Sequence, residues 1–239
     1  MTTAAQVEVK ETPIIFSGPM VRAILQGRKT QTRRVIKRLP DGVRFASPLP
    51  ESDYQYRFTD FESHTDLRCP YGRPQLPLEP PRDRLWVRET WQPYREHSAE
   101  QNAVIKKSLD RFERGEVKDV VTEVKGWPFP PNGERKILYA ADFGDWAYDV
   151  DSDLKHWKSP LFLPRDLSRI TLEITDIRVE RIQGISRADA IAEGVEPFIG
   201  KDTTAWRAGF QIGWDEINAK RGYSWSNNPW VWAITFKKL

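Results

Sequence analysis

Gly27-Arg28-Lys29-Thr30-Gln31-Thr32-Arg33-Arg34 marks a predicted corner between a short helix and a strand. Apolar residues within 17–26 recur at helical spacing, which predicts a helix before this stretch. Gly27 stands where the end of a helix favours a residue that adopts a positive φ angle. The β-branched residues of 30–36 predict a strand. Lys29 is therefore expected at a helix-to-strand corner, where polar groups from separate segments can converge.

Two proline-rich stretches interrupt the ordered parts of the chain. The first, 39–83, contains eight prolines and little periodicity, which indicates a long loop or an insertion with small elements of its own. The second, 92–160, is also irregular, with one possible helix at 99–114 and one short strand at 136–140.

Alternating segments follow both stretches. Residues 84–91 alternate apolar and polar side chains, as a half-buried strand does. A longer alternation covers 169–182 and changes phase near Asp176, where we expect a bend or a bulge. Ser186-Arg-Ala-Asp189 matches a capping box that opens a short helix, and Gly194 is expected to end it.

The last quarter of the chain predicts a longer helix at 203–220 and an apolar strand at 230–236. Four apolar residues of that helix share one face: Trp206, Phe210, Trp214 and Ile217. This order of elements predicts an α+β fold built as a small, partly closed β-barrel with flanking helices. We interpret 1–11 as a disordered tail and 12–239 as a single domain that carries the two irregular insertions.

Charge is unevenly distributed along a chain with 37 basic and 34 acidic residues, a net charge of +3. Between Thr12 and Pro40 there is no Asp or Glu, whereas seven Lys and Arg residues fall there. A local positive field favours contact with phosphate groups. The same pattern also fits a solvated face whose counter-charges come from elsewhere in the fold.

Several classes of protein are disfavoured by composition. A single cysteine, Cys69, excludes an internal disulfide, and with three scattered histidines it argues against a Cys/His metal site. No apolar run reaches the roughly 18–20 residues that span a bilayer, and the first residues lack a signal-peptide pattern. We expect a soluble, cytoplasmic protein with no metal, cofactor or membrane partner.

Lys29 and Thr32 are the first candidate site residues, because a tight turn could place an amine and a hydroxyl in one pocket. A lysine among Arg28, Arg33 and Arg34 has a destabilised ammonium, and burial would lower its pKa further. Such an amine can activate a hydroxyl nucleophile. The alternative is a basic helix end followed by an edge strand whose charges deter aggregation.

Glu193 is the second candidate, because a carboxylate at the C-terminal end of a helix opposes the helix dipole. The alternative is an exposed glutamate that favours helix formation. Tryptophans are the third: Trp86 faces outward if its neighbours face the core, and Trp230 shares a strand face with Trp232. Aromatic rings stack on unpaired bases, but for any one of these tryptophans a place in the core is the favoured interpretation.

The turn resembles that of the ASCH domain, a member of the PUA-like superfamily of small β-barrels, whose motif is Gly-x-Lys-x-x-Glu-x-Arg. Gly27, Lys29 and Arg34 match it, while Thr32 stands at the glutamate position. That departure resembles the small bacterial N4-acetylcytidine amidohydrolases, whose turn reads Gly-Arg-Lys-Thr-x-Thr. The resemblance implies a metal-free catalytic group of Lys29, Thr32 and Glu193.

The resemblance covers about 110–120 residues, at 13–38, 84–91, 168–195 and 228–238. The whole chain also looks like ASCH-type proteins encoded in bacteriophages and prophages, which would place it in a bacterial host cell. Contacts with the substrate or nucleic acid are expected from seven residues: Arg28, Arg33, Arg34, Trp86, Arg88, Glu89 and Trp230.

The resemblance thus implies an enzyme that hydrolyses an amide on an N4-acylcytidine-like nucleoside. Lys29 would act as general base, Thr32 as nucleophile or water-positioning hydroxyl, and Glu193 as proton shuttle to the leaving amine. An arginine, Arg33 or Arg34, would stabilise the oxyanion or contact a phosphate. The alternative is a non-catalytic module that binds RNA or modified phage DNA. A structural or host-interaction role is a third possibility.

Overall fold

The computed structural model describes residues 9–37, 39, 42–49, 55–59, 63–72, 82–93, 137–143, 157–195 and 203–239. The chain divides into two compact units. The first consists of Met1–Ile14, Ala23–Val87 and Arg169–Leu239, and the second of Ile15–Arg22 and Arg88–Ser168. The second unit thus contains the long insertion at 92–160, whereas the insertion at 39–83 belongs to the first.

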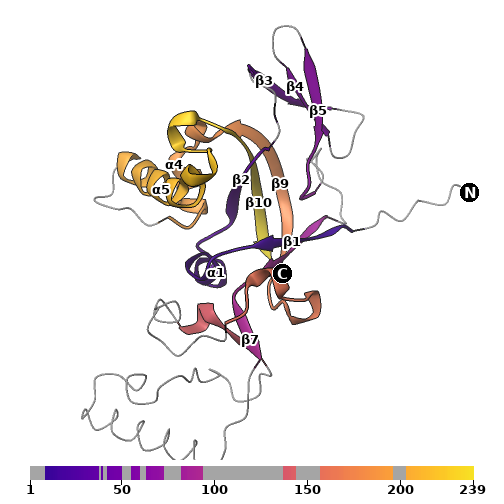
Figure 1. Cartoon of the computed structure of the whole chain (residues 1–239), viewed down its shortest axis with the longest axis vertical. Helices are drawn as coiled ribbons and strands as arrows, with labels where there is room; N and C mark the ends of the chain where they lie inside the picture. The colour runs from indigo at the N-terminus through magenta and orange to yellow at the C-terminus, as the bar shows by residue number, and fades with distance from the viewer. Residues whose placement is uncertain are drawn as a thin grey trace, which may run out of the picture. The chain divides into compact units, whose positions relative to one another are not determined.

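A five-stranded sheet forms the centre of the first unit, in the order β1-β6-β9-β10-β2 (Figure 1). Its strands are β1 (Glu11–Ile15), β2 (Gln31–Val35), β6 (Arg84–Arg88), β9 (Thr171–Arg181) and β10 (Trp230–Lys238). β9 is antiparallel to β6 and β10, and β10 is antiparallel to β2. The mixed α+β class is therefore confirmed. Among the described strands, β1 and β2 form the two edges of the sheet.

A bulge in β9 explains the phase shift that the sequence predicts near Asp176. Asp176 pairs with Thr235 and Ile174 pairs with Phe236, so Thr175 is an extra residue on its strand. Beyond the bulge, Arg178 pairs with Ala233 of the neighbouring strand. Side chains directly opposite each other share a face of the sheet. The bulge therefore decides which residues of β9 face each side.

Helices cover one face of this sheet. α1 (Gly18–Leu25) leads to Gly27, which has the predicted positive φ, 73°. α4 (Arg187–Ala192) begins with the predicted capping box and ends before Gly194, at φ 81°. α5 (Thr203–Asn218) packs against α4 and is followed by a 3₁₀ turn, η6 (Ala219–Arg221). A shared apolar cluster lies beneath α4 and α5: Ile182, Ile185, Ala190, Phe210, Trp214, Trp225 and Val231.

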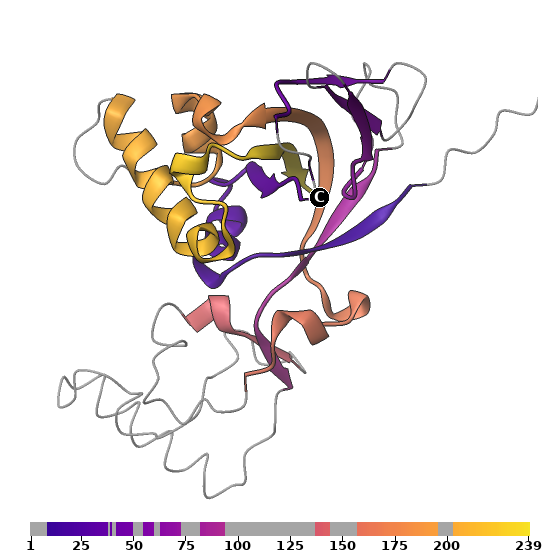
Figure 2. The ribbon, with the colours of Figure 1, turned by 45° about the horizontal axis from the view of Figure 1, so that its top comes forward.

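The first insertion contains a small antiparallel sheet of β3 (Phe45–Pro48), β4 (Gln55–Thr59) and β5 (His64–Arg68). It packs on the face of the central sheet opposite to α4 and α5 (Figure 2). The Tyr56 hydroxyl donates to the Ile177 carbonyl at 2.7 Å, and its ring meets the Trp232 ring edge-on at 5.0 Å. The central sheet is therefore covered on both faces near the middle of β9 and β10.

Burial of both faces places Trp86 and Trp232 in the core, and one residue of the predicted helix face is corrected. Trp86 does not face outward: its side chain is 7% exposed, and its neighbours in β6 are buried as well. Trp232 is 3% exposed, because the small sheet covers it. Ile217 does not join the core although it has helical spacing from Trp214, since it is 44% exposed near the end of α5.

In the second unit, β7 (Trp91–Pro93) pairs with β8 (Ile137–Tyr139), which confirms the short strand expected there. Trp91, Tyr139 and Leu163 form a small apolar cluster. Among the residues described after these strands there are three 3₁₀ turns: η1 (Ala140–Phe143), η3 (Pro160–Phe162) and η4 (Arg165–Leu167). The helix expected at 99–114 lies outside the described residues. Where the chain is described, none of its helices has the length and apolar character needed to cross a membrane.

Candidate functional site

The predicted corner at Gly27–Arg34 lies against the end of α4. The backbone amides of Arg28 and Lys29 both donate to the Ala23 carbonyl, which turns the chain out of α1. Lys29 and Glu193 then form an isolated antiparallel bridge. A Cβ added to Gly194 would lie only 3.0 Å from the Lys29 Cβ, so the chain passes closely here. Glycine at this position lets the end of α4 reach the start of β2.

Lys29 is buried, with 2% of its surface exposed, and its ammonium contacts three acceptors. Nζ lies 2.6 Å from Glu193 Oε2, 3.0 Å from the Glu193 carbonyl and 2.7 Å from the Gln31 carbonyl. An ammonium has three donors, and three acceptors surround it. The geometry is that of a charged lysine paired with a carboxylate.

The pKa of Lys29 is lowered from its ordinary value, as the sequence predicts. Burial, which disfavours the charged amine, is the largest cause. Glu193 opposes it by stabilising the ammonium, while the charges of Arg34 and Arg33 lower the pKa further. The amine therefore releases its proton more readily than a solvated lysine does.

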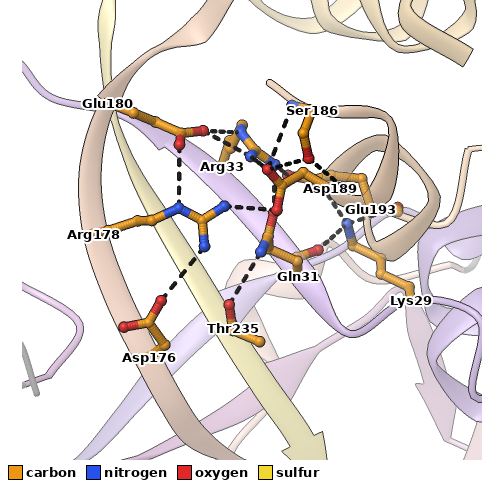
Figure 3. Close-up of polar contacts among 10 residues, drawn as sticks. All are labelled: Lys29, Gln31, Arg33, Asp176, Arg178, Glu180, Ser186, Asp189, Glu193 and Thr235. Carbon is orange, nitrogen blue, oxygen red and sulfur yellow. Dashed lines mark hydrogen bonds and ion pairs between the residues drawn. The ribbon is translucent and has the colours of Figure 1, made fainter. Parts of the chain in front are cut away.

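Arg33 connects Glu193 to two further carboxylates (Figure 3). Its side chain is fully buried. Nη1 lies 3.2 Å from Glu193 Oε1 and donates to Gln31 Oε1 at 2.6 Å. Nε donates to Glu180 Oε1 at 2.7 Å, and Nη2 lies 3.3 Å from Asp189 Oδ2. The guanidinium thus contacts side chains from β2, β9 and the α4 region.

Arg178 binds two of these carboxylates, Glu180 and Asp189, from the side nearer to solvent. Its guanidinium contacts Asp189 Oδ1 at 2.6 Å, Glu180 Oε2 at 3.2 Å and Asp176 Oδ2 at 3.4 Å. Burial acts to raise the pKa of Asp189, but the Ser186 hydroxyl and the two arginines outweigh it and lower that pKa to about 2. Asp189 is therefore ionised over the physiological range.

Strand alternation explains how these residues meet. Gln31 and Arg33 are two apart on β2 and share the face that carries Ala233 and Thr235 of β10. Beyond the bulge, β9 directs its polar residues to that same face, which α4 covers: Asp176, Arg178 and Glu180. Gln31 Nε2 also donates to Thr235 Oγ1 at 3.1 Å.

Seven members of this network were not among the predicted site residues: Gln31, Asp176, Arg178, Glu180, Ser186, Asp189 and Thr235. Of these, Ser186 and Asp189 were interpreted only as a helix cap. The sequence of β9 could have indicated some of them, because three charged residues alternate after the predicted phase shift. Their meeting with β2 depends on the register of β10, which lies between the two strands. That register joins segments far apart in the sequence.

The structure brings together Lys29 and Glu193 but directs Thr32 elsewhere. Thr32 is buried and lies opposite Ile234 in the β2–β10 register. Because strand side chains alternate, its hydroxyl lies on the face opposite to Gln31 and Arg33. The hydrogen bonds of the Lys29 ammonium described above do not include Thr32.

The residues expected to bind a ligand have different surroundings. Arg28 is exposed, with Nη1 3.5 Å from the Gly194 carbonyl, so it lies at the rim of the Lys29–Glu193 pair. Arg34 is half-buried. Arg33 is enclosed by carboxylates, which does not suit contact with a phosphate. Trp230 is half-buried beneath the Arg181 guanidinium, 4.4 Å from its ring.

Two expected ligand contacts, Arg88 and Glu89, belong to the second unit. Glu89 is 1% exposed and Arg88 is half-buried. The Lys29–Glu193 site itself consists of residues of the first unit.

Lys29 also occupies the outer edge of β2. The Thr30 carbonyl accepts from Phe236 of β10, so the next carbonyl, that of Gln31, points away from β10. The Lys29 ammonium binds this outward carbonyl. The ammonium thus covers one outward carbonyl of this edge strand, while the alternative that these charges deter aggregation stays a prediction.

Comparisons with protein-family models, with curated proteins and with solved structures found no match. The candidate site therefore rests on its own geometry. It contains a buried amine and a buried carboxylate in direct contact, a pair that can exchange a proton. Within the described ranges, no group of three or more His, Cys, Asp and Glu residues could hold a metal ion.

Proposed function

We propose that this protein is an ASCH-type member of the PUA-like superfamily that hydrolyses an amide on a modified nucleobase or nucleoside of the N4-acylcytidine kind. One observation carries the proposal: Lys29 Nζ and Glu193 Oε2 lie 2.6 Å apart, although 164 positions separate them in the chain. The resemblance implies both residues from their positions in the sequence alone. A chance pair of Lys and Glu at that separation would rarely meet in a buried contact.

The order of elements also supports the fold part of the proposal. A helix joins the edge strands β1 and β2, and the short helix α4 follows the long strand β9. The chain thus brings the Gly-x-Lys turn and the end of α4 together, as the resemblance requires. In this proposal the central five-stranded sheet is the wall of the PUA-like barrel.

Hydrolysis of the amide adds water across the C–N bond and releases a carboxylic acid and the free cytosine amine. In the proposed cycle the Lys29 ammonium first passes a proton to Glu193 Oε2 across their 2.6 Å contact. Its lowered pKa favours this transfer. The neutral amine then takes a proton from the attacking hydroxyl, and the Glu193 carboxyl protonates the leaving amine. Both residues end in the states in which they began.

The attacking hydroxyl in this cycle is that of a water molecule, because the Thr32 hydroxyl lies on the face of the sheet opposite to Gln31 and Arg33. Thr32→Ser retains the hydroxyl and Thr32→Val removes it, so turnover by these two variants distinguishes an essential hydroxyl from a packing role.

The direct test is incubation with N4-acetylcytidine, with cytidine and acetate measured by chromatography. Wild-type protein should release both in equal amounts, whereas Lys29→Met and Glu193→Gln should each lose about 100-fold or more. Lys237→Ala is the matched control, since it removes an exposed lysine that pairs with Glu173 on the same sheet. Circular dichroism identifies variants that fail to fold.

Two results would overturn the proposal: no turnover by folded wild-type protein, or equal turnover by folded Lys29→Met. Binding of RNA or DNA at about 50 mM salt without turnover would instead favour the non-catalytic module, because phosphate contacts are strong at low ionic strength.

A further inference from the structure

We propose that Arg33 is a positioning residue, which fixes the Glu193 carboxylate so that one oxygen faces the Lys29 amine. The inference rests on the proposed function for the reaction that this geometry serves. The contacts that support it are independent of any substrate. They concern the two oxygens of one carboxylate and the side chains that hold the guanidinium.

The two carboxylate oxygens of Glu193 have separate partners. Oε2 lies 2.6 Å from Lys29 Nζ, and Oε1 lies 3.2 Å from Arg33 Nη1 (Figure 3). A glutamate has three rotatable bonds, and Glu193 follows the last turn of a short helix. A single contact would leave its carboxylate free to rotate about that contact. The second contact fixes both oxygens.

Arg33 can act as a fixed support because its own guanidinium is held on several sides. Glu180 and Asp189 contact it from β9 and α4, and Gln31 Oε1 accepts from the same Nη1 that faces Glu193. Its side chain is fully buried. A planar guanidinium bound along several edges has little freedom to move.

Charge gives Arg33 a second function in this arrangement. Its guanidinium lies between Glu193 and the carboxylates of Glu180 and Asp189. Like charges repel strongly where water is excluded. Without Arg33, Glu193 would face two carboxylates across a buried gap and would turn away from its present position.

Gln31 links this support to the amine. Its carbonyl accepts from Lys29 Nζ at 2.7 Å, and its side-chain Oε1 accepts from Arg33 Nη1 at 2.6 Å. One residue of β2 therefore sets the position of both cations that contact Glu193. The substrate need not touch Arg33 for the reaction to depend on it.

The test compares wild type with Arg33→Lys and Arg33→Gln. Because Arg33 is buried away from any substrate, KM should stay within about threefold while kcat falls by about 10- to 100-fold in both variants. Arg57→Gln is the matched control, since it removes another strand arginine that binds a carboxylate, Asp66, at a remote site. Unchanged kcat in folded Arg33→Lys would overturn the proposal.

A second measurement needs no turnover: the pKa of the Lys29 amine, from nitrogen NMR of the lysine ammonium groups. Glu193 raises this pKa, whereas Arg33 and Arg34 lower it. Arg33→Lys retains the charge but loses the planar guanidinium with its several donors. If Glu193 is displaced as a result, it stabilises the Lys29 ammonium less, and the Lys29 pKa should fall further. An unchanged pKa would mean that Arg33 acts through its charge alone, which overturns positioning.

The two measurements also separate the proposals. If wild-type protein does not hydrolyse N4-acetylcytidine, the proposed function fails, while the NMR titration still decides whether Arg33 positions Glu193. If wild type is active and the Lys29 pKa and kcat are both unchanged in Arg33→Lys, only the positioning inference fails. If Arg33→Gln does not fold, Arg33→Lys alone supplies both results.

Discussion

Glu193 contacts Lys29 through both its side chain and its backbone: Nζ lies 2.6 Å from Oε2 and 3.0 Å from the carbonyl oxygen. The same two residues also form a backbone bridge between the end of α4 and the start of β2. The proposed chemical pair is thus also a structural junction. Substitutions here should change stability as well as activity, and each experiment has to measure both.

Removal of both partners of this buried pair should destabilise the protein less than the two single removals added together. Glu193→Gln leaves a buried ammonium without its carboxylate, which costs about 3–5 kcal/mol in such pairs. Lys29→Met combined with Glu193→Gln should cost less than the sum of the single changes, because no unpaired ammonium remains. Urea unfolding of the four proteins measures the coupling. Additive losses would show that the contact contributes little.

The pH dependence of stability should carry the signature of Lys29. Its pKa in the folded protein is below the ordinary value of 10.5. Between the folded pKa and 10.5 the unfolded chain binds more protons, so stability rises with pH in that window. Below the folded pKa the penalty for burying the ammonium is present in full. Between the folded pKa and 10.5, the unfolding free energy of wild type minus that of Lys29→Met should therefore increase with pH. A flat difference would contradict the shift.

Asp189 should have the opposite signature at acid pH. Its folded pKa is about 2, below the ordinary 3.8. Its contribution is therefore complete above the ordinary value and is lost as pH falls towards 2. The stabilities of wild type and Asp189→Asn should converge over this range, as followed by thermal unfolding. Ser186→Ala, which removes the cap together with the hydroxyl bound to Asp189, should cost about 1 kcal/mol. A constant gap between wild type and Asp189→Asn would contradict the assignment.

Gly194→Ala should be more damaging than Gly27→Ala, although both glycines have positive φ. The backbone conformation alone costs a non-glycine residue about 1–3 kcal/mol. At Gly27 an added Cβ meets nothing within 4 Å, whereas at Gly194 it would lie 3.0 Å from Lys29 and 3.2 Å from Ala23. Chemical denaturation of both variants measures the difference. Equal losses would mean that Lys29 shifts without penalty.

Local signals in the sequence predicted much of the framework around the site. The capping box at Ser186, the positive φ at Gly27 and the phase shift near Asp176 depend on neighbouring residues, and the structure has all three. The burial of Trp86 could not be read in the same way, because it depends on what covers the second face of the sheet. The alternation within β6 alone does not contain that information.

The polar network shows the same limit at the level of the site. Lys29 and Glu193 were selected by type and by resemblance, and their contact is present. The carboxylates around Arg33 come from β9 and α4 and are set by the register of three strands. Register between distant segments follows from packing of the whole sheet, so the sequence does not indicate which carboxylates supply the counter-charges of the basic stretch.

The extra residue in β9 sets the side on which the polar half of the strand lies. Leu172 and Ile174 face the apolar side, and if Thr175 were paired as in a regular strand, the residues at 176, 178 and 180 would continue on that side. Closing the bulge at constant length would thus rotate three charged side chains into the hydrophobic core. Deletion of Thr175 would instead restore strict alternation and leave them on their present side, because Asp176 would then directly follow Ile174. The strand therefore tolerates the loss of this one residue better than a change in its pairing.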